Sequence, residues 1–366
     1  MTSIQSFSHS DRQFWHSQKV LLTGHTGFKG SWLAFWLKEL GAQVTGVALE
    51  QEGRPNLFDQ LQLKRLIDHR VGDIRDPDLL KAIVNETQPT VVFHLAAQPL
   101  VRHSYEEPVA TWSTNVMGTI HLLEALRLLD QPCSTVLITT DKVYRNNEWV
   151  YGYRENDPLG GHDPYSSSKA AAEIAIASWR SSFCGTAPHQ TPHLRVASAR
   201  AGNVIGGGDW AQDRIVPDAM RALSRGEAIV VRNPRATRPW QHVLEPLGGY
   251  LQLAEYLSTS AEYSSAFNFG PHLEANRPVR ELVEEALRHW PGAWHDQSDP
   301  HALHEASRLN LVIDKAHHQL GWAPRWDFAT TVERTINWYR RVQDGQASAL
   351  ECCRDDLAAF LTPSPA

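Results

Sequence analysis

The sequence predicts an α/β fold, in which a Rossmann-type doubly wound parallel sheet is joined to a smaller, interleaved C-terminal domain. Two observations indicate this fold. Short apolar runs rich in β-branched residues alternate with helical patterns as far as Ala199, the order expected for a parallel sheet with helices on both faces. The first of these runs leads into a glycine-rich turn and then a helix, as at the start of many such sheets.

Length and composition set the size of the protein and exclude some classes of partner. The 366 residues are 42% hydrophobic and carry a formal net charge of −6. This is enough chain for one large or two modest domains with a sizeable core. Charge is spread without long basic runs, so we expect no nucleic-acid partner. No apolar run approaches the roughly 18 residues of a membrane span, so we expect no membrane partner.

Cysteine and histidine usage indicates the compartment and the metal content. The four cysteines form no CxxC pair, and residues 1–18 lack the apolar core of a signal peptide. We therefore expect a reducing, cytoplasmic location. The histidine pairs His301/His304 and His317/His318 have no third ligand near them in the sequence, so we predict no metal site.

The first predicted strand, Lys19–Thr23, opens the candidate cofactor site. Three glycines follow it at a spacing of GxxGxxG, and apolar residues then recur at helical spacing up to Gly41. This strand, turn and helix order is what a dinucleotide site requires: the first glycine makes the tight turn, the second lets the backbone approach a pyrophosphate, and the third lets the helix pack on the strand. The expected contacts are Gly24, Thr26, Gly27, Phe28, Lys29 and Gly30.

The next three predicted strands complete the expected adenosine pocket. The strand at 43–49 ends in Ala48 and Leu49, with an acid only at Glu50 and no arginine for a 2′-phosphate, which favours NAD over NADP. Asp73, beside Ile74, follows another strand and is placed to hydrogen-bond adenine, while Asp76 is a candidate helix N-cap. The strand at 90–97 ends in small residues, which allow a cofactor to lie against the backbone; the expected contacts there are Leu95, Ala96 and Ala97.

The predicted strand at 134–140 carries the candidate catalytic residues. Thr140, Asp141 and Lys142 come where this strand ends, and ligands bind at that edge of an open parallel sheet. A helix expected from Pro164 places Tyr165 and Lys169 on one face, because residues four apart are neighbours there. A free phenol has a pKa of about 10, and a nearby ammonium lowers it, so Tyr165 becomes a candidate base. The alternative is a surface tyrosine beside a lysine.

Together these motifs resemble the extended short-chain dehydrogenase/reductase family, within it the nucleotide-sugar 4,6-dehydratases, and most narrowly the CDP-glucose branch. The resemblance runs from about residue 19 to residue 341. The matching stretches are HTGFKGSWL at 25–33, AQPLVRHSY at 97–105, TNVMG at 114–118, DK at 141–142, LGGHDPYSSSK at 159–169, ARAGNVIGGGDW at 199–210 and RNPRATRPWQHVLEPL at 232–247.

The resemblance implies a reaction on CDP-glucose with bound NAD. Hydride leaves C4 of the glucosyl ring while Tyr165 takes the O4 proton, water then leaves across C5 and C6, and the hydride returns to C6. Thr140 would bond O4 and the phenol, and Asp141 would be the acid for O6. Lys142 departs from the dTDP-glucose branch, in which a glutamate base follows the aspartate. It is either the C5 base, with a lowered pKa, or a group that stabilises the enolate or holds a water.

The resemblance also implies further ligands. Asn115 would contact the cofactor, and Gln98 and Ser104 would lie near the glucosyl group. Asn203 and Arg238 would bind the diphosphate, for which the planar guanidinium of arginine is suited. Two arginines, Arg214 and Arg235, are weaker candidates, and two tryptophans, Trp210 and Trp240, are either stacking partners for cytosine or core residues.

Domain boundaries and assembly complete the expectations. We predict an NAD-binding domain of residues 18–202 plus 236–262, a nucleotide-sugar-binding domain of residues 203–235 plus 263–345, and a C-terminal tail of residues 346–366. The helices at 115–129 and 170–179 are apolar on most faces, which predicts burial on both sides. The family resemblance implies that such helices pair in a four-helix bundle, giving a homodimer or homotetramer. It also implies deoxysugar biosynthesis, as for lipopolysaccharide O-antigen.

Three alternatives are weighed against this prediction. A 4-epimerase shares hydride removal at C4, but it usually carries a small residue where Asp141 stands. A non-catalytic nucleotide-sensing module usually loses Tyr165 or Lys169, and both are present. A GDP-mannose dehydratase uses glutamate after the threonine and favours NADP.

Overall fold

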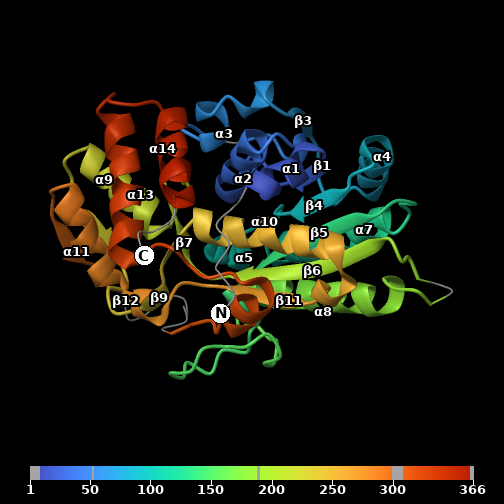
Figure 1. The fold of residues 1–366 in the computed structure, drawn as a ribbon. Coiled ribbons are helices and arrows are strands. Elements are labelled where there is room, and N and C mark those ends of the chain that lie inside the picture. The colour runs from blue at the N-terminus through green and yellow to red at the C-terminus, as the bar shows by residue number, and fades with distance from the viewer. Residues whose placement is uncertain (1–8, 52, 188–189, 299–307, 363–366) are drawn as a thin grey trace.

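A seven-stranded parallel sheet forms the centre of the computed structural model, which describes residues 9–51, 53–187, 190–298 and 308–362 (Figure 1). The strand order is β11-β6-β5-β4-β1-β2-β3, so the order reverses between β1 and β4. The strands of this sheet are β1 (Lys19–Thr23), β2 (Gln43–Ala48), β3 (Asp68–Val71), β4 (Val91–His94), β5 (Cys133–Thr140), β6 (Leu194–Ala201) and β11 (Ala266–Phe269).

Helices cover both faces of the sheet. On one face α2 (Phe28–Glu39) and α10 (Leu244–Thr259) pack into a large apolar core. On the other face α4 (Pro77–Thr87), α7 (Gly118–Leu126) and α8 (Pro164–Phe183) pack on a second core. The shorter helices of this half are α1 (His9–His16), α3 (Leu57–Gln60), α5 (Val101–Glu106), α6 (Pro108–Trp112) and α12 (Asp314–Leu320). This is the predicted doubly wound fold.

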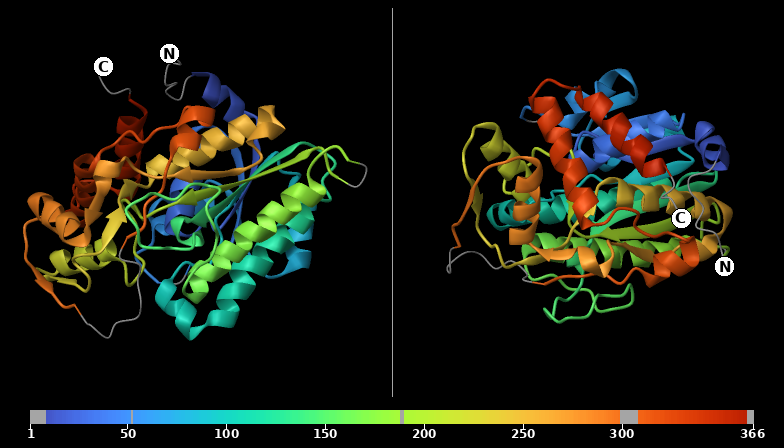
Figure 2. Two further views of the ribbon diagram at one scale, coloured as in Figure 1. Left: turned by 90° about the horizontal axis from the view of Figure 1, so that it is seen from below. Right: turned by 60° about the vertical axis from the view of Figure 1, so that its left-hand side comes forward.

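The second half gathers at one end of the sheet (Figure 2). Its helices are α9 (Ile215–Ser224), α11 (Val279–His289), α13 (Phe328–Gln343) and α14 (Ala349–Leu361). Its strands pair as three two-stranded sheets: β7 (Val204–Ile205) with β10 (Gln241–His242), β9 (Thr237–Pro239) with β12 (Asn276–Pro278), and β8 (Ile229–Val231) with β13 (Trp294–Asp296). The short 3₁₀ turns are η1 (Leu63–Arg65), η3 (Asp141–Val143), η4 (Ala261–Tyr263) and η5 (Leu273–Ala275).

Most predicted elements lie where the residue pattern placed them. The strand Lys19–Thr23 and the helix start at Pro164 agree with the prediction, and Asp76 caps α4 by accepting hydrogen bonds from the backbone N–H groups of Asp78 and Leu79. The predicted strand at 90–97 ends earlier, at His94. The helix expected over 115–129 begins inside a π-helical segment, η2 (Ser113–Met117), and α7 ends at Leu126. The extra backbone residue of a π-turn is not visible in an apolar pattern.

The central sheet extends further along the chain than the boundary drawn at residue 262. Strand β11 pairs with β6 in parallel, with Ala266 opposite Ser198, although residues 263–345 were assigned to the second domain. Helix α12 then packs on β11. The central sheet therefore includes this later strand, and the division of the chain into two domains stays a prediction.

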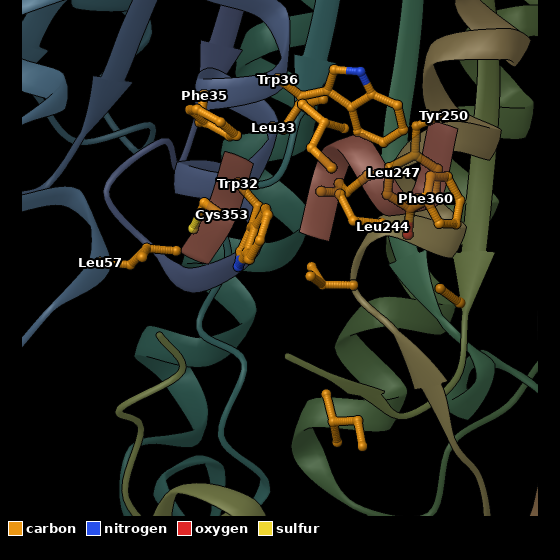
Figure 3. Close-up of a cluster of buried hydrophobic side chains, with 14 of the residues drawn as sticks. Trp32, Leu33, Phe35, Trp36, Leu57, Leu244, Leu247, Tyr250, Cys353 and Phe360 are labelled. Carbon is orange, nitrogen blue, oxygen red and sulfur yellow. The ribbon is translucent and has the colours of Figure 1, made fainter. Parts of the chain in front are cut away.

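The C-terminal segment, predicted only as a tail, folds as α14 and packs into the main core. Figure 3 shows Cys353 and Phe360 of α14 among side chains of α2 and α10. The rings of Trp36 and Phe360 lie edge to face, 5.8 Å apart. Ser348 begins α14 with a capping box to Glu351. The segment thus supports the helix that follows the glycine turn.

None of the helices within the described residues combines the length and apolar composition needed to cross a membrane. Among the same residues, no three His, Cys, Asp or Glu side chains gather as a metal site would require. His301 and His304 lie outside the described residues, whereas His317 and His318 lie on α12 with their rings 5.3 Å apart.

Candidate active site

The predicted site residues gather at the carboxyl edge of the sheet. Thr23, the last residue of β1, pairs with His94 of β4, which in turn pairs with Leu137 of β5. The loops that follow these strands therefore leave the sheet side by side. They lie where the strand order reverses, and in open α/β sheets this is the place of ligand binding.

The glycine turn after β1 is set by close backbone packing at two positions. Gly24 has a φ of +75°, and a Cβ there would lie 2.6 Å from the backbone nitrogen of Ala96. A Cβ on Gly30 would lie 2.1 Å from the carbonyl oxygen of Gly24. Both positions therefore require glycine for packing within the protein, as predicted for the turn and for the helix–strand contact.

Gly27, in contrast, is not explained by contacts within the protein. A Cβ there would meet no atom closer than the Gly24 oxygen at 3.5 Å, and its φ of −75° suits any residue. Gly27 is exposed and is the N-cap of α2, whose first turn donates no capping hydrogen bond to a side chain. An open space before uncapped helix N–H groups fits a pyrophosphate, so the residues present here fit a dinucleotide cofactor.

On the adenosine side of the expected cofactor site, β2 ends at Ala48 and is followed by Leu49. Leu49 is 60% exposed, and its carbonyl oxygen accepts a hydrogen bond of 3.3 Å from Thr26 Oγ1. Asp73 accepts hydrogen bonds from the backbone and side chain of Arg75, and the side-chain bond to Arg75 lowers the pKa of Asp73. Ile74 is buried in the second core, whereas Leu95, Ala96 and Ala97 are half-buried beside the turn.

Asn115 and Gln98 bond to each other rather than to an open site. Asn115, in the π-helical segment, donates from Nδ2 to the Gln98 carbonyl oxygen at 3.1 Å and to Ser168 Oγ at 2.9 Å, and its Oδ1 accepts from the Gln98 N–H at 2.9 Å. The Gln98 side chain donates to Leu100 O and Thr111 Oγ1. In this structure both side chains fix the loop after β4.

The end of β5 holds a buried acid with one free oxygen. Asp141 is fully buried, and its Oδ1 accepts from Thr140 Oγ1 at 2.9 Å and from Lys142 Nζ at 3.3 Å. Its Oδ2 has no hydrogen-bond partner among the described residues. A Cβ at Gly202 would lie 3.3 Å from that oxygen, so the glycine keeps the space beside it open. A buried carboxylate oxygen without a partner is costly unless a ligand uses it.

Tyr165 and Lys169 lie on one face of α8 as predicted, but their electrostatics differ from the prediction. Burial raises the pKa of Tyr165 to about 12, although a hydrogen bond with Thr140 opposes this. Lys169 donates from Nζ to the Ile138 carbonyl oxygen at 3.1 Å, and burial lowers its own pKa to about 8. The pKa of Tyr165 is therefore raised where the sequence predicted a lowering, because burial and the charge of Asp141 outweigh the hydrogen bond with Thr140 and the charge of Arg214.

Ser104 contacts the start of α8 instead of pointing to a sugar site. Its buried hydroxyl accepts from the Tyr165 backbone N–H at 3.2 Å and donates to Val101 O at 2.6 Å. One of the N–H groups at the start of α8 is thereby satisfied, and Asp163 caps the same helix. Ser104 thus helps to hold Tyr165 in place.

Four cations surround this edge. Burial is the main reason that the pKa of Lys29 is lowered to about 7; the charges of Arg214, Lys169 and Lys142 act in the same direction, and Asp141 opposes them. The Lys29 ammonium lies 5.9 Å from the ring centroid of Tyr250. Arg214 comes from the second half of the chain, where its Nη1 donates to Asp209 at 2.9 Å, and its charge also acts on Tyr165. The structure therefore brings this weaker sequence candidate to the site.

The remaining substrate candidates lie on the second half. Asn203 follows β6 and has a buried Oδ1 without a partner among the described residues. Arg238 lies on β9 and donates to Thr237 O at 3.0 Å. Arg235 is exposed. Trp240 is buried and donates to Arg277 O, and Trp210 packs edge to face on Tyr339, so both tryptophans contact protein side chains or backbone here.

Sequence reasoning missed a buried charge pair behind the site. Glu173 and Arg200 lie 2.8 Å apart, and both are almost fully buried. Two signals were available: Glu173 continues the spacing of Tyr165 and Lys169 by another four residues, and Arg200 interrupts an apolar strand.

Comparisons with known proteins show the family of the chain. A family model described as GDP-mannose 4,6-dehydratase matches residues 21–335. The CDP-glucose 4,6-dehydratase of Salmonella typhimurium is 46% identical over 96% of this chain and 98% of its own. The dTDP-glucose 4,6-dehydratase of Streptomyces venezuelae, solved with NAD bound, shares 23% identity over 89% of this chain and 98% of its own, with a TM-score of 0.75.

A UDP-glucose 4-epimerase from Stenotrophomonas maltophila, also solved with NAD, gives a TM-score of 0.76 at 20% identity over 90% of this chain and 99% of its own. The backbone alone thus fits dehydratases and epimerases equally, and the sequence matches decide between them. Because the family model spans most of the chain and the Salmonella enzyme is similar over nearly its whole length, the chain belongs to the GDP-mannose 4,6-dehydratase family of nucleotide-sugar dehydratases.

Proposed function

We propose that the protein converts CDP-glucose into CDP-4-dehydro-6-deoxy-glucose with bound NAD. The observation that carries this proposal is the Asp141 carboxylate, buried beside Thr140 and Lys142 at the strand end that faces Tyr165. A 4-epimerase needs only to move hydride and a proton at C4, whereas a dehydratase must also protonate a leaving hydroxyl at C6. The similarity to the Salmonella CDP-glucose enzyme supports the choice of nucleotide.

In the first half of the proposed reaction the chain removes the proton from O4. NAD, when bound, accepts hydride from C4 and later returns it to C6. Thr140 hydrogen-bonds the Tyr165 phenol, and both groups would contact the sugar hydroxyl. Because burial raises the Tyr165 pKa to about 12, the phenolate needs positive charge, which Arg214 and the bound oxidised cofactor provide. Oxidation at C4 makes the neighbouring C5–H bond acidic.

In the second half Asp141 delivers the proton that leaves with the C6 hydroxyl. Its Oδ1 already accepts two hydrogen bonds, so we assign the proton to Oδ2, the oxygen without a partner among the described residues. Water forms from the C6 hydroxyl and this proton as a base removes the C5 proton. Lys142 has two candidate roles, as that base or as the cation that stabilises the enolate. Its donation to Asp141 Oδ1 supports the second role.

The second half of the chain would hold the CDP group. The charge of Arg214 acts on Lys29 and on Tyr165, which supports a role for its guanidinium beside the sugar nucleotide. The buried Oδ1 of Asn203, unpartnered within the described residues, supports a ligand at the end of β6. We place the diphosphate between Asn203, Arg214 and Arg238, because the two guanidinium groups suit phosphate oxygens. Gln98 and Ser104 would act from behind, by fixing the loop and the helix start.

Product analysis tests the proposal directly. Purified protein is incubated with CDP-, dTDP-, UDP- and GDP-sugars, and the products are identified by mass spectrometry and NMR. We expect loss of one water from CDP-glucose and little turnover of the others. Inversion at C4 with no loss of water would show an epimerase. Preferential turnover of GDP-mannose would place the chain with the alternative dehydratase.

We also propose a homodimer or homotetramer formed through α7 and α8. Several apolar side chains on and near these helices are exposed in the single chain, in the region expected to form the helix bundle: Val109, Trp112, Met117, Leu128 and Ile174. Light scattering at micromolar concentration tests this, and a monomer would contradict it. The four cysteines are free thiols, which supports a reducing cytoplasm, and the product suits deoxysugar synthesis such as that of O-antigens.

A further inference from the structure

The buried pair Glu173–Arg200 connects helix α8, which carries Tyr165 and Lys169, to strands β5 and β6. Glu173 lies one helical turn beyond Lys169 on α8, and its Oε1 accepts from Thr139 Oγ1 at 2.6 Å. Its Oε2 accepts from Ser198 Oγ and from Arg200 Nη2, each at 2.8 Å. One carboxylate thus fastens the catalytic helix to both β5 and β6. Thr139, the β5 contact, immediately precedes Thr140 and Asp141.

Arg200 extends the connection to the loop that leads into α8. Its Nη1 donates to the Tyr144 hydroxyl at 2.8 Å and to the Glu155 carbonyl oxygen at 3.0 Å. The Tyr144 hydroxyl in turn donates to Asn268 on β11 at 2.7 Å, and Asn268 donates to the Tyr153 carbonyl oxygen. The segment between the Asp141 turn and Tyr165 is therefore anchored near its start, at Tyr144, and in its middle, at Tyr153 and Glu155, to one guanidinium and its partners.

A buried ion pair is not explained by stability alone. Removing charges from water is costly, and apolar residues of similar volume often hold a core equally well. Burial opposes the charge on Glu173, but Arg200 and the hydroxyl donors outweigh it and keep the pKa of Glu173 below its usual value. The site thus maintains a carboxylate where a leucine would pack, and the charge faces the catalytic ammonium of Lys169.

We propose that Glu173 and Arg200 are a positioning pair for the oxidation step: together they set the placement of Tyr165 and Lys169 against the strand end that carries Thr140 and Asp141, and Glu173 supplies the negative charge that Lys169 faces. Neither residue touches substrate. The proposal rests on the proposed function, because it needs Tyr165 and Lys169 to act in removing the O4 proton.

The charged groups around Lys169 make the second part testable. Burial lowers the pKa of Lys169, and Glu173, which lies on the same helix, opposes this by raising it. Lys169 in turn lowers the pKa of His94 on β4 and of Lys29 on α2. Burial lowers the His94 pKa to about 3, so that ring is neutral. Glu173 is therefore the carboxylate that supports the ammonium. Without it, Lys169 loses its proton at a lower pH.

The test removes both charges together, since one alone would leave the other buried and unpaired. We expect the double variant Glu173→Leu/Arg200→Met to stay folded. Single-turnover oxidation of CDP-glucose, followed by the absorbance of reduced cofactor, should slow by about 100-fold with KM unchanged, the usual effect of a small misplacement. In the pH profile of the oxidation rate, the loss of activity on the alkaline side should occur at a lower pH in the double variant than in the wild type. A purely structural role would leave this pH unchanged.

A control variant separates this effect from the general loss of an ion pair, here one in which Asp356 is buried and Arg334 is partly exposed. Arg334 and Asp356, 3.6 Å apart on α13 and α14, form a pair remote from α8 (Figure 1). The variant Arg334→Met/Asp356→Leu should keep the wild-type rate and pH profile. A folded Glu173→Leu/Arg200→Met protein with both properties unchanged would overturn the proposal.

A milder variant covers the case in which the double variant does not fold. Thr139→Val removes one hydrogen bond to Glu173 and keeps the shape of the side chain, and it should slow oxidation severalfold without changing KM. An unchanged rate would overturn the proposal. Failure of the proposed function is a separate result, because the wild type itself would then yield no 4-keto-6-deoxy sugar.

Discussion

The two edges of the active site are built by different means. The cofactor edge, formed by the β1–α2 turn and the loop after β4, is shaped by missing side chains: Gly24 and Gly30 leave no room for a Cβ. The acid–base edge, formed by the end of β5 and the start of α8, is shaped by the buried ionisable side chains of Asp141 and Lys169. The first edge therefore tolerates no added atom at Gly24 and Gly30, whereas the second depends on buried ionisable groups.

The acid–base edge should give the largest effect. Asp141→Asn keeps size and shape but removes the acid, so elimination should slow by about 10² to 10⁴ while oxidation at C4 continues. Reduced cofactor and 4-keto sugar should accumulate on mixing with CDP-glucose, visible in the absorbance of the nicotinamide. Tyr165→Phe serves as control and should give no such signal. If Asp141→Asn neither accumulates reduced cofactor nor slows product release, Asp141 is not the acid.

The cofactor edge should separate packing from ligand approach. Gly30→Ala places a Cβ 2.1 Å from a backbone oxygen and should destabilise the fold by at least about 3 kcal/mol. Gly27→Ala meets only the Gly24 oxygen at 3.5 Å, so its melting temperature should hardly change. Its NAD affinity should nevertheless fall at least tenfold, about 1.4 kcal/mol, in a titration of cofactor-stripped protein. Unchanged affinity in Gly27→Ala would mean that no pyrophosphate lies there.

Cofactor choice is a smaller test of the same edge. With exposed Leu49 at the end of β2 and no arginine there, NAD should bind at least tenfold tighter than NADP, about 1.4 kcal/mol. Leu49→Arg should reduce the preference for NAD over NADP, because it adds a cation that can pair with the 2′-phosphate of NADP. The two dissociation constants are measured by fluorescence titration. Equal affinities in the wild-type protein would contradict the assignment.

The smallest effect concerns Lys29, where the two edges meet. Its pKa is about 7 in the folded protein against an ordinary value of 10.5, so between these pH values the unfolded chain holds a proton that the folded chain lacks. This contribution makes stability rise with pH across that window. Lys29→Met should flatten the rise, which we expect as a few degrees in melting temperature measured at pH 7 and pH 10. Parallel curves for both proteins would refute the lowered pKa.

The cofactor edge was the more predictable of the two because its physics is local. The glycine spacing and the apolar strand before it predict that Gly24, Gly27 and Gly30 lie in the cofactor turn, without knowledge of the rest of the chain. At the other edge, spacing placed Tyr165 beside Lys169, but the direction of the Tyr165 pKa depends on how much of the fold excludes water around it. This burial comes from residues that are far apart in the sequence, so a local pattern does not reveal it. For the same reason the sequence does not reveal that Arg214 approaches this edge.

Long-range pairing limited the prediction of the fold in the same way. The alternating pattern predicts a parallel sheet, but it cannot say that β11, after a long excursion, returns to pair with β6. The α14 helix carried a readable signal, a capping box at Ser348 and apolar residues at helical spacing. Its partners, Trp36 on α2 among them, lie far away in the sequence.

The contact between α2 and α14 has a consequence for synthesis of the protein. Phe360 emerges from the ribosome about 300 residues after Trp36, which is roughly 15 to 60 s at ordinary elongation rates. Throughout that interval the tryptophan-rich face of α2 lacks its final cover, although the glycine turn has already been made. The nascent chain therefore exposes an apolar surface next to its own cofactor site, and α14, the last helix to be synthesised, covers this surface.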